Sequence, residues 1–261
     1  MKDYLTPHLR ELPYFRALLR AVEARFYKDI SLPGPVLDLG CGDGHFASLA
    51  FEKPIEMGLD PWWEPIREAR KYNSYQHLVC GAGDRLPYPA DFFASGISNS
   101  VLEHIPELDP VLEDLARVLK PGAQFIFCVP NHRFLETLSI GRWLDRMGLS
   151  GLAGNYRSFF NRISRHYHCD SSSVWETRLN AHGFVIDDWW DYFPPEALHT
   201  LEWGHYFGLP SWVSKALFGR WILSPSAWNL AFTERLVRPH YDRDPRSSEG
   251  VYSFYITRMV G

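Results

Sequence analysis

The stretch Val36-Leu-Asp-Leu-Gly-Cys-Gly-Asp-Gly44 decides the fold class of this 261-residue chain. Residues 35–39 predict a short buried strand, and residues 45–51 predict the helix that follows it. Between them, Gly40 and Gly42 permit positive φ and let the backbone approach a ligand without a Cβ in the way. The first N–H groups of the helix suit a carboxylate or a phosphate. The stretch therefore predicts a ligand-binding turn between a strand and a helix, and the alternative is a tight turn that binds nothing.

Two acidic residues restrict the ligand that this turn can take. The glycines lack the GxGxxG spacing of dinucleotide sites, and Asp38 stands two residues before the first of them. A carboxylate there opposes a diphosphate but suits an ammonium group. Asp60 ends the second expected strand, where an acid can accept hydrogen bonds from ribose hydroxyls; its alternative role is to cap the helix that Pro61 opens. Trp62 or Trp63 can lie against a purine face.

Strands and helices alternate regularly as far as residue 130. The expected strands are 35–39, 55–59, 77–80, 94–98 and 124–129. The helices expected between them are 45–51, 64–72 and 108–119. This order is typical of βαβ units, so we predict an α/β fold with a parallel sheet.

Two further segments lie before and after this regular part, and we expect all of residues 1–261 to form a single domain. Apolar residues at helical spacing predict N-terminal helices within residues 1–30. Residues 131–170 are expected to be an insertion after the fifth strand. It begins with a helix over 134–147 and continues as a passage rich in Gly, Asn, Arg and Ser. Ser171 is expected to cap a helix that runs to Ala181.

The last part of the chain is rich in aromatic residues. Eight of the ten tryptophans lie after residue 142. Residues 184–193 and 251–260 predict the last two strands. Between them, residues 195–250 follow neither the helical nor the strand period, and we expect them to form an aromatic-rich cap.

Charge and cysteine usage exclude several classes of protein. The net charge of −4 gives no reason to expect nucleic acid as a partner. Four widely spaced cysteines without a CxxC pair are typical of reduced thiols rather than of a disulfide framework. The N-terminus lacks the apolar core of a signal peptide, and no uncharged apolar run approaches the roughly 18 residues of a membrane span. We predict a cytoplasmic location.

Five motifs, in order along the chain, resemble those of the class I S-adenosylmethionine-dependent methyltransferases. The branch is the methyltransferase 11, or ubiquinone/menaquinone-biosynthesis-like, branch. The motifs are VLDLGCGDG (36–44), GLDP (58–61), RLPYPADFF (85–93), SVLEHI (100–105) and ARVLKPGAQFIFCVPN (116–131). They cover a little over a third of the chain.

The resemblance implies a fold and a cofactor. The fold is a Rossmann-like, seven-stranded, mostly parallel sheet of order 3-2-1-4-5-7-6, with helices on both faces and a helical lid inserted between the last two strands. The cofactor is S-adenosyl-L-methionine, with S-adenosyl-L-homocysteine as its product.

The resemblance also assigns cofactor contacts to residues near the ends of the first four strands. They are Asp38, Gly40, Cys41 and Gly42 for the methionine portion; Asp60, Pro61 and Trp62 around the ribose; Gly83 and Asp84 at the adenine edge; and Ser98 and Asn99 beneath the reactive methyl group.

The chain departs from the family pattern at two positions. The family usually has a Phe-Asp pair at the start of the fourth strand, and this chain has Phe93-Ala94 there. We expect this difference to affect the stability of the strand. The chain also has Ala82 at a position where the family commonly has Asp. This difference affects the expected contact between Asp84 and the adenine.

Histidines near the insertion are the candidates for a general base. An acceptor hydroxyl must lose its proton on methylation, and a positioned base can remove it. The candidates are His166, Tyr167 and His168, which enter the helix after Ser171, and His132, which follows the fifth strand. Each has an alternative structural role. His166, His168 and Cys169 have poor spacing for zinc, so we predict no metal, and His104 is expected to support a helix start.

We expect a methyltransferase that acts on a small-molecule or lipid-like acceptor, with oxygen as the methylated atom. The alternatives are methylation of nitrogen or carbon, or a cofactor-binding protein that transfers no methyl group and uses the lid as an interaction surface. The cap is expected to wall an apolar acceptor cavity; peripheral contact with a membrane through residues 195–230 is the alternative. The acceptor and the oligomeric state are not readable from the sequence.

Overall fold

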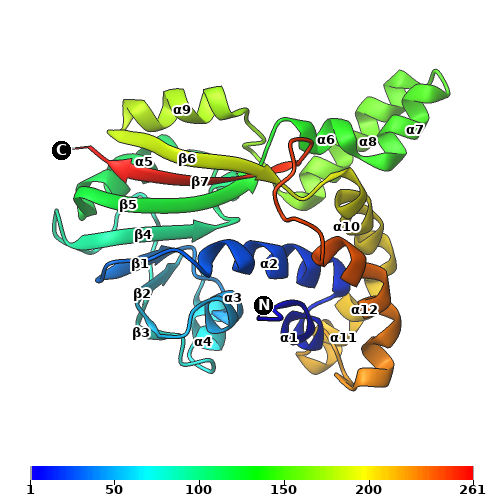
Figure 1. Cartoon of the computed structure of the whole chain (residues 1–261), viewed down its shortest axis with the longest axis horizontal. Coiled ribbons are helices and arrows are strands. Elements are labelled where there is room, and N and C mark those ends of the chain that lie inside the picture. The colour runs from blue at the N-terminus through cyan, green and yellow to red at the C-terminus, as the bar shows by residue number, and fades with distance from the viewer. Residues whose placement is uncertain (1, 261) are drawn as a thin grey trace.

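The computed structural model describes residues 2–260, and at Leu209 the backbone alone. Its strands form one sheet of order β3-β2-β1-β4-β5-β7-β6, which confirms the predicted order (Figure 1). β7 runs antiparallel to both β5 and β6, and the other neighbouring pairs are parallel. The strands are β1 (Val36–Leu39), β2 (Ile55–Asp60), β3 (Tyr75–Cys80), β4 (Phe93–Asn99), β5 (Leu119–Pro130), β6 (Phe184–Tyr192) and β7 (Tyr252–Met259).

Helices cover both faces of the sheet. Because side chains alternate along a strand, β5 directs Ile126 and Cys128 to one hydrophobic cluster and Phe125 and Phe127 to the other. The first cluster contains residues of α2 (Tyr14–Tyr27), α3 (His45–Ala50) and α4 (Trp63–Ala69). The second contains residues of α5 (Asp109–Val118) and α9 (Ser172–Ala181).

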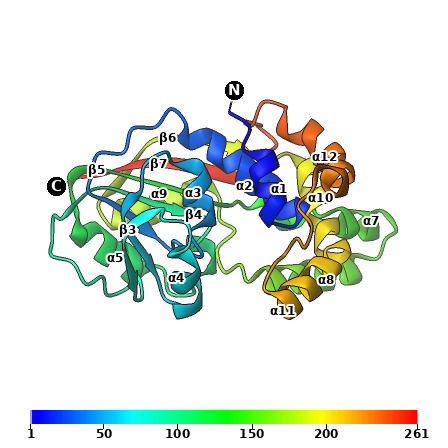
Figure 2. The ribbon, with the colours of Figure 1, turned by 90° about the horizontal axis from the view of Figure 1, so that it is seen from below.

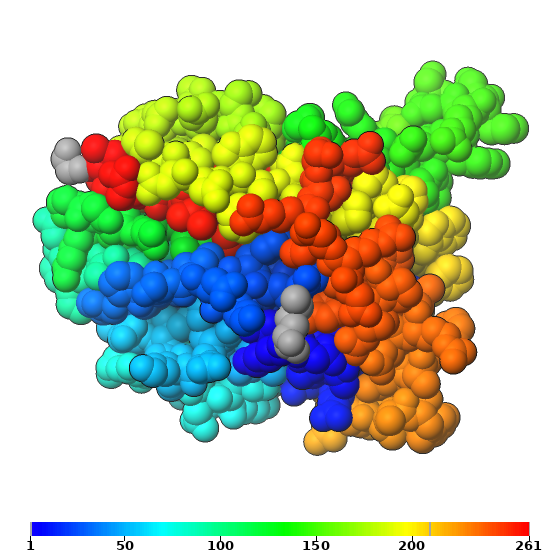
Figure 3. Space-filling view, in the orientation of Figure 1, coloured from blue at the N-terminus to red at the C-terminus, as the bar shows by residue number. Residues whose placement is uncertain are grey.

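The remaining helices gather beyond the carboxyl ends of the parallel strands (Figures 1 and 2). α10 and α12 contact α2, and α1 contacts both α2 and α12. Figure 3 shows the α7–α8 region projecting from the molecule. These helices are α1 (Leu5–Glu11), α6 (Arg133–Thr137), α7 (Ser139–Arg146), α8 (Ser150–Ser164), α10 (Pro195–Phe207), α11 (Leu209–Phe218) and α12 (Ala227–Tyr241); a 3-10 turn, η1 (Leu102–His104), follows β4.

The insertion after β5 differs from the prediction. The single helix expected over 134–147 is divided at Leu138, whose ψ of 128° is extended. The division has a tertiary cause, because the buried Glu202 carboxylate accepts hydrogen bonds from the N–H groups of Ser139 and Ile140 at 2.6 and 3.2 Å. The passage rich in Gly, Asn, Arg and Ser, for which no helix was predicted, contains the fifteen-residue helix α8.

The segment between β6 and β7 is helical, although its sequence follows no clear period. It forms α10, α11 and α12, and its large apolar side chains are divided between the core and the surface. Leu198 and Leu201 are buried, whereas Trp212 and Trp228 are 62% and 80% exposed. Because apolar residues lie on more than one side of these helices, the sequence shows no single stripe. The limits 1–30, 131–170 and 195–250, and the single-domain organisation, remain predictions.

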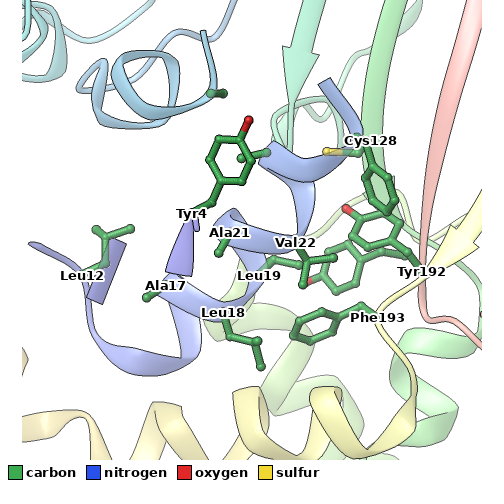
Figure 4. Packing of buried hydrophobic residues seen from close by; sticks show 14 of the residues in the cluster. Tyr4, Leu12, Ala17, Leu18, Leu19, Ala21, Val22, Cys128, Tyr192 and Phe193 are labelled. Carbon is green, nitrogen blue, oxygen red and sulfur yellow. The ribbon is translucent and has the colours of Figure 1, made fainter. Parts of the chain in front are cut away.

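α2 is the element on which the cap and the sheet meet. Figure 4 shows Leu19 and Val22 on the side of this helix that faces Tyr192 and Phe193 at the end of β6. α10 approaches the other end of α2 at Gly204, where a Cβ would lie 2.4 Å from Cβ of Phe15. A side chain at residue 204 therefore cannot be accommodated without separating α10 from α2.

We expect Gly204→Ala to lower the free energy of unfolding by about 1–3 kcal/mol, because the added methyl group overpacks this contact. Gly154→Ala in α8 is the matched control, since a Cβ there meets nothing within 4 Å. The control should raise stability by about 0.5–1 kcal/mol, because Gly is unfavourable in a helix interior. Denaturant titration measures both values, and equal effects of the two substitutions would contradict the close contact of α10 with α2.

Candidate active site

The turn after β1 has the backbone that its glycines predict. Gly40, Gly42 and Gly44 have φ values of 81°, 56° and 75°. A Cβ at Gly40 would lie 2.4 Å from a methyl group of Val101, whereas a Cβ at Gly42 would meet nothing within 4 Å. Gly40 is therefore required for packing, and Gly42 leaves open space above the turn. An open backbone of this kind is a surface that a ligand can approach closely.

Asp60 fixes the shape of this turn. One carboxylate oxygen accepts a hydrogen bond from the N–H of Gly42 at 3.0 Å, and the other accepts one from the N–H of Trp62 at 2.9 Å. Burial raises the pKa of Asp60, and the two N–H donors oppose that effect. Because Trp62 precedes α4, Asp60 does contribute to the start of that helix. The side chains of Trp62 and Trp63 are exposed.

Asp38 is a buried acid next to the turn. The hydroxyl of Tyr75 donates a hydrogen bond to its Oδ2 at 2.6 Å. Burial raises the pKa of Asp38 to about 7, although the hydrogen bond from Tyr75 acts in the opposite direction. A carboxyl group with this pKa changes charge near neutrality and can become the counter-ion of an ammonium group.

The polar residues that end β4 face α2 as well as the turn. Ser98 donates a hydrogen bond to the carbonyl of Leu39 at 2.9 Å. Asn99 and Ser100 donate to the carboxylate of Glu23 at 2.6 and 2.9 Å. The Asn99 amide oxygen accepts a hydrogen bond from the thiol of Cys128 at 3.2 Å, so both polar groups of this side chain are engaged. Its role beneath the methyl group remains a prediction.

The fully buried Glu23 carboxylate accepts hydrogen bonds from two more side chains. Arg20, one turn earlier on α2, donates to it at 2.8 Å, and the hydroxyl of Tyr192 at the end of β6 donates at 3.0 Å. Burial disfavours the charge on Arg20, but the Glu23 carboxylate beside it raises its pKa above the ordinary value. Sequence reasoning missed Glu23 altogether.

A cavity of about 370 Å³ opens beside these residues, between α2, the end of β4 and the helices beyond the sheet. Its polar wall contains Arg16, Arg20, Glu103, His104, His166 and His205. Its apolar wall includes Phe15, Phe134, Trp212 and Trp221. The cavity is close in size to a small-molecule site, and it adjoins the end of β4, where ligands of open α/β sheets bind.

Of the four candidate bases, His166 lines this cavity. Burial lowers its pKa to about 3, and the nearby His104 and His205 act in the same direction. His168 is occupied elsewhere, with Nε2 2.9 Å from the carbonyl oxygen of Ile105 and Nδ1 3.6 Å from Asp170. Tyr167 and His132 are exposed and are not among the residues that line the cavity.

Glu103, His104 and His166 lie close together on the cavity wall. One ligand atom from each lies within 4.8 Å of the others, so among the described residues this cluster could hold a divalent cation. Burial raises the pKa of Glu103 to about 8, and its Oε2 has no hydrogen-bond partner within the described part of the chain. The absence of a metal remains a prediction. His104, which we expected to support a helix start, also faces the cavity.

Comparison with known sequences identifies similar proteins. Residues 37–127 match a family described as a methyltransferase domain. The mouse mitochondrial ubiquinone biosynthesis O-methyltransferase is 27% identical over 130 residues, which cover 46% of this chain and 35% of that protein. The ubiquinone biosynthesis O-methyltransferase of Vibrio atlanticus is 31% identical over 112 residues, which cover 40% of this chain and 46% of that protein. The matches thus span less than half of either relative.

Solved structures share the fold over most of the chain. An S-adenosylmethionine-dependent methyltransferase of Thermotoga maritima, described as a possible histamine N-methyltransferase, has a TM-score of 0.56 at 15% identity, covering 95% of this chain and 91% of that one. The [4+2]-cyclase SpnF has a TM-score of 0.55 at 17% identity, covering 94% and 82%. A cyclase among these neighbours illustrates that the fold alone does not determine the reaction.

The pKa of Asp38 predicts a pH dependence for ligands that carry an ammonium group. The carboxyl group keeps its proton up to about pH 7. It must lose that proton to pair with the ligand, so affinity for S-adenosylhomocysteine should rise with pH by up to about tenfold per unit below pH 7 and level off above it. Calorimetry at several pH values measures this. Asp38→Asn should flatten most of the dependence, and an equally steep dependence in that variant would contradict the role of Asp38.

Proposed function

We propose that this chain, which belongs to the class I S-adenosylmethionine-dependent methyltransferases, transfers a methyl group to an oxygen atom of a small or lipid-like acceptor. The observation that carries the proposal is the position of the cavity. It begins at Ser100, directly after the β4 residues assigned to the reactive methyl group. An acceptor in the cavity would therefore lie next to the cofactor edge of the sheet.

The turn and its two acids fit the cofactor of this family, S-adenosylmethionine. Gly42 leaves space at the backbone, Asp60 stands at the end of β2, and Asp38 is a buried acid that can pair with an ammonium group. When bound, the cofactor supplies a methyl group activated by a positively charged sulfur. The chain then has to hold the acceptor in line with that group, and such positioning can supply roughly 7–11 kcal/mol of the barrier.

His166 is the proposed proton acceptor for the hydroxyl group of the acceptor. Burial keeps its imidazole ring neutral at neutral pH, so the ring has a lone pair available. Its Nδ1 lies 3.7 Å from the sulfur of Cys169. His104 has Nδ1 3.0 Å from the carbonyl oxygen of Arg165, so its hydrogen is directed away from His166. His166 is therefore the candidate base that combines a neutral ring with a place on the cavity wall.

His166→Ala should lower kcat by up to about 10²-fold, the low end of the usual contribution of a general base, because a ring with a pKa near 3 is a weak base. The binding of S-adenosylhomocysteine should not weaken. The measurement is transfer of a radiolabelled methyl group to phenolic acceptors and to lipid extracts. His77→Ala, an exposed histidine on β3, is the control and should leave the rate unchanged. A wild-type rate in His166→Ala would remove this residue from the reaction. A label on nitrogen or carbon in the isolated product would overturn O-methylation.

We also propose that the exposed aromatic face of α11 and α12 makes peripheral contact with a membrane. Its exposed apolar side chains are Trp212, Val213, Leu217, Phe218, Trp228 and Phe232. No acidic residue occurs from Trp203 to Thr233, and the segment contains the half-buried Lys215 and the exposed Arg220. Aromatic and basic residues together favour the interface of an anionic membrane. Among the described residues, none of the helices has the length and apolar character to cross a bilayer.

A double substitution of Phe218 and Trp228 by Ser should reduce binding to vesicles of phosphatidylglycerol and phosphatidylcholine. We expect a loss of about tenfold or more, because each aromatic ring buried at the interface contributes to binding. Co-sedimentation measures the bound fraction. Trp143→Ser is the matched control, since this tryptophan is 57% exposed on α7, away from the proposed face. Equal binding by wild type and the double variant would exclude α11 and α12 as the membrane face.

A further inference from the structure

Two arginines on α2 line the cavity, and only one of them has a counter-ion. Arg20 pairs with Glu23 at 2.8 Å and also donates to the carbonyl of Asn99 at 3.4 Å. Arg16, one turn earlier, has no carboxylate within 4 Å and no hydrogen-bond acceptor in the described part of the chain. Its guanidinium lies 5.5 Å from the ring centre of Trp221, which is also on the cavity wall.

The other groups around Arg16 do not compensate its charge. The protein atoms around its guanidinium lower the pKa of Arg16, and the positive charge of Arg20 acts in the same direction, although part of the side chain remains exposed to solvent. Asp43, in the glycine turn, raises the pKa of Arg16 from beyond ion-pair distance. Glu103, on the same wall, has a pKa raised by burial to about 8 and is largely protonated at neutral pH.

The histidines of the cavity add no negative charge either. Burial lowers the pKa values of His104, His166 and His205, so these rings are neutral at neutral pH. The cavity therefore carries one uncompensated positive charge. The Arg16 side chain is exposed on the cavity wall. Its N–H donors are therefore accessible to a ligand of opposite charge, which would supply the missing counter-ion.

We propose that Arg16 binds an anionic group, a carboxylate or a phosphate, of the methyl acceptor. A guanidinium group presents paired N–H donors that match two oxygens of either anion. Phe15, Trp212 and Trp221 then enclose the apolar part of the same molecule. The acceptor is thus an acid that carries an aromatic or aliphatic body. This inference rests on the proposed function, because it takes the cavity as the acceptor site.

The carboxylate of the cofactor is the other anion that could reach α2. Arg20 is better placed for it, because Arg20 contacts the end of β4 through the carbonyl of Asn99. Arg16 instead lies against Trp221, which follows α11 in the cap. The two arginines therefore face different ends of the cavity, and Arg16 faces the acceptor end.

The test compares the binding of benzoate and benzamide to the protein saturated with S-adenosylhomocysteine, followed by tryptophan fluorescence because Trp221 lies beside Arg16. Wild type should bind benzoate about tenfold or more tighter than benzamide, since a charge-assisted hydrogen bond is lost with the amide. Arg16→Met should abolish this preference, Arg16→Lys should keep part of it, and the exposed control Arg85→Met should keep all of it.

Three results would overturn the inference: no saturable preference for benzoate in wild type, an unchanged preference in Arg16→Met, or a tenfold loss of S-adenosylhomocysteine affinity in Arg16→Met. The last result would assign Arg16 to the cofactor carboxylate. The proposed function can fail separately from this inference. In that case the protein would transfer no methyl group to any hydroxylated acid, but the preference for benzoate that depends on Arg16 would persist.

Discussion

The buried carboxylate of Glu23 is the interaction on which the rest of the site depends. It accepts hydrogen bonds from Arg20 on α2, from Asn99 and Ser100 at the end of β4, and from Tyr192 at the end of β6. A charge buried this fully is tolerated only when a counter-charge and hydrogen bonds compensate it. The compensation comes from three elements far apart in the sequence, so Glu23 is satisfied only when α2 lies across the carboxyl ends of the strands.

The placement of α2 has consequences for both halves of the site. On the side of the sheet, Glu23 holds the polar residues that follow β4, next to the glycine turn. On the side of the cap, the same helix presents Phe15 and Arg16 to the cavity and packs against Gly204 of α10. The proposed cofactor edge and the cavity therefore share one wall. This arrangement explains why the N-terminal helix, which lies outside the matched family region, contributes charged groups to the candidate site.

Features with a local signal could be predicted from the sequence. The glycine turn and the Ser171 cap, whose hydroxyl accepts from the N–H of Val174, agree with the structure. The order of the strands, which the family resemblance implied, agrees as well. α8 was not predicted: its sequence is rich in Gly, Asn, Arg and Ser, although Gly151 and Gly154 adopt no positive φ there. A helical lid between the last two strands was expected from the family resemblance, but the periodicity did not delimit α10 to α12, because apolar residues cover more than one side of each helix.

Features that depend on tertiary contact could not be predicted in the same way. Glu23 is hydrogen-bonded to Asn99, which lies 76 positions away in the sequence, and no local sequence pattern indicates that pairing. One signal was nevertheless present. Arg16, Arg20 and Glu23 follow the spacing i, i+4, i+7 within a mainly apolar helix, which places three charges on one face. A charged stripe on a helix that must be buried indicates a polar site at that face.

The unfolding free energy of Glu23→Ala tests the central role of this carboxylate most directly. The substitution leaves the largely buried Arg20 cation without its counter-ion, so we expect a loss of about 3–5 kcal/mol in denaturant titration. Glu68→Ala removes an acid from an exposed i,i+3 pair with Lys71 and should change stability by less than about 1 kcal/mol. If Glu23→Ala is as mild as Glu68→Ala, the buried network does not hold α2 against the sheet.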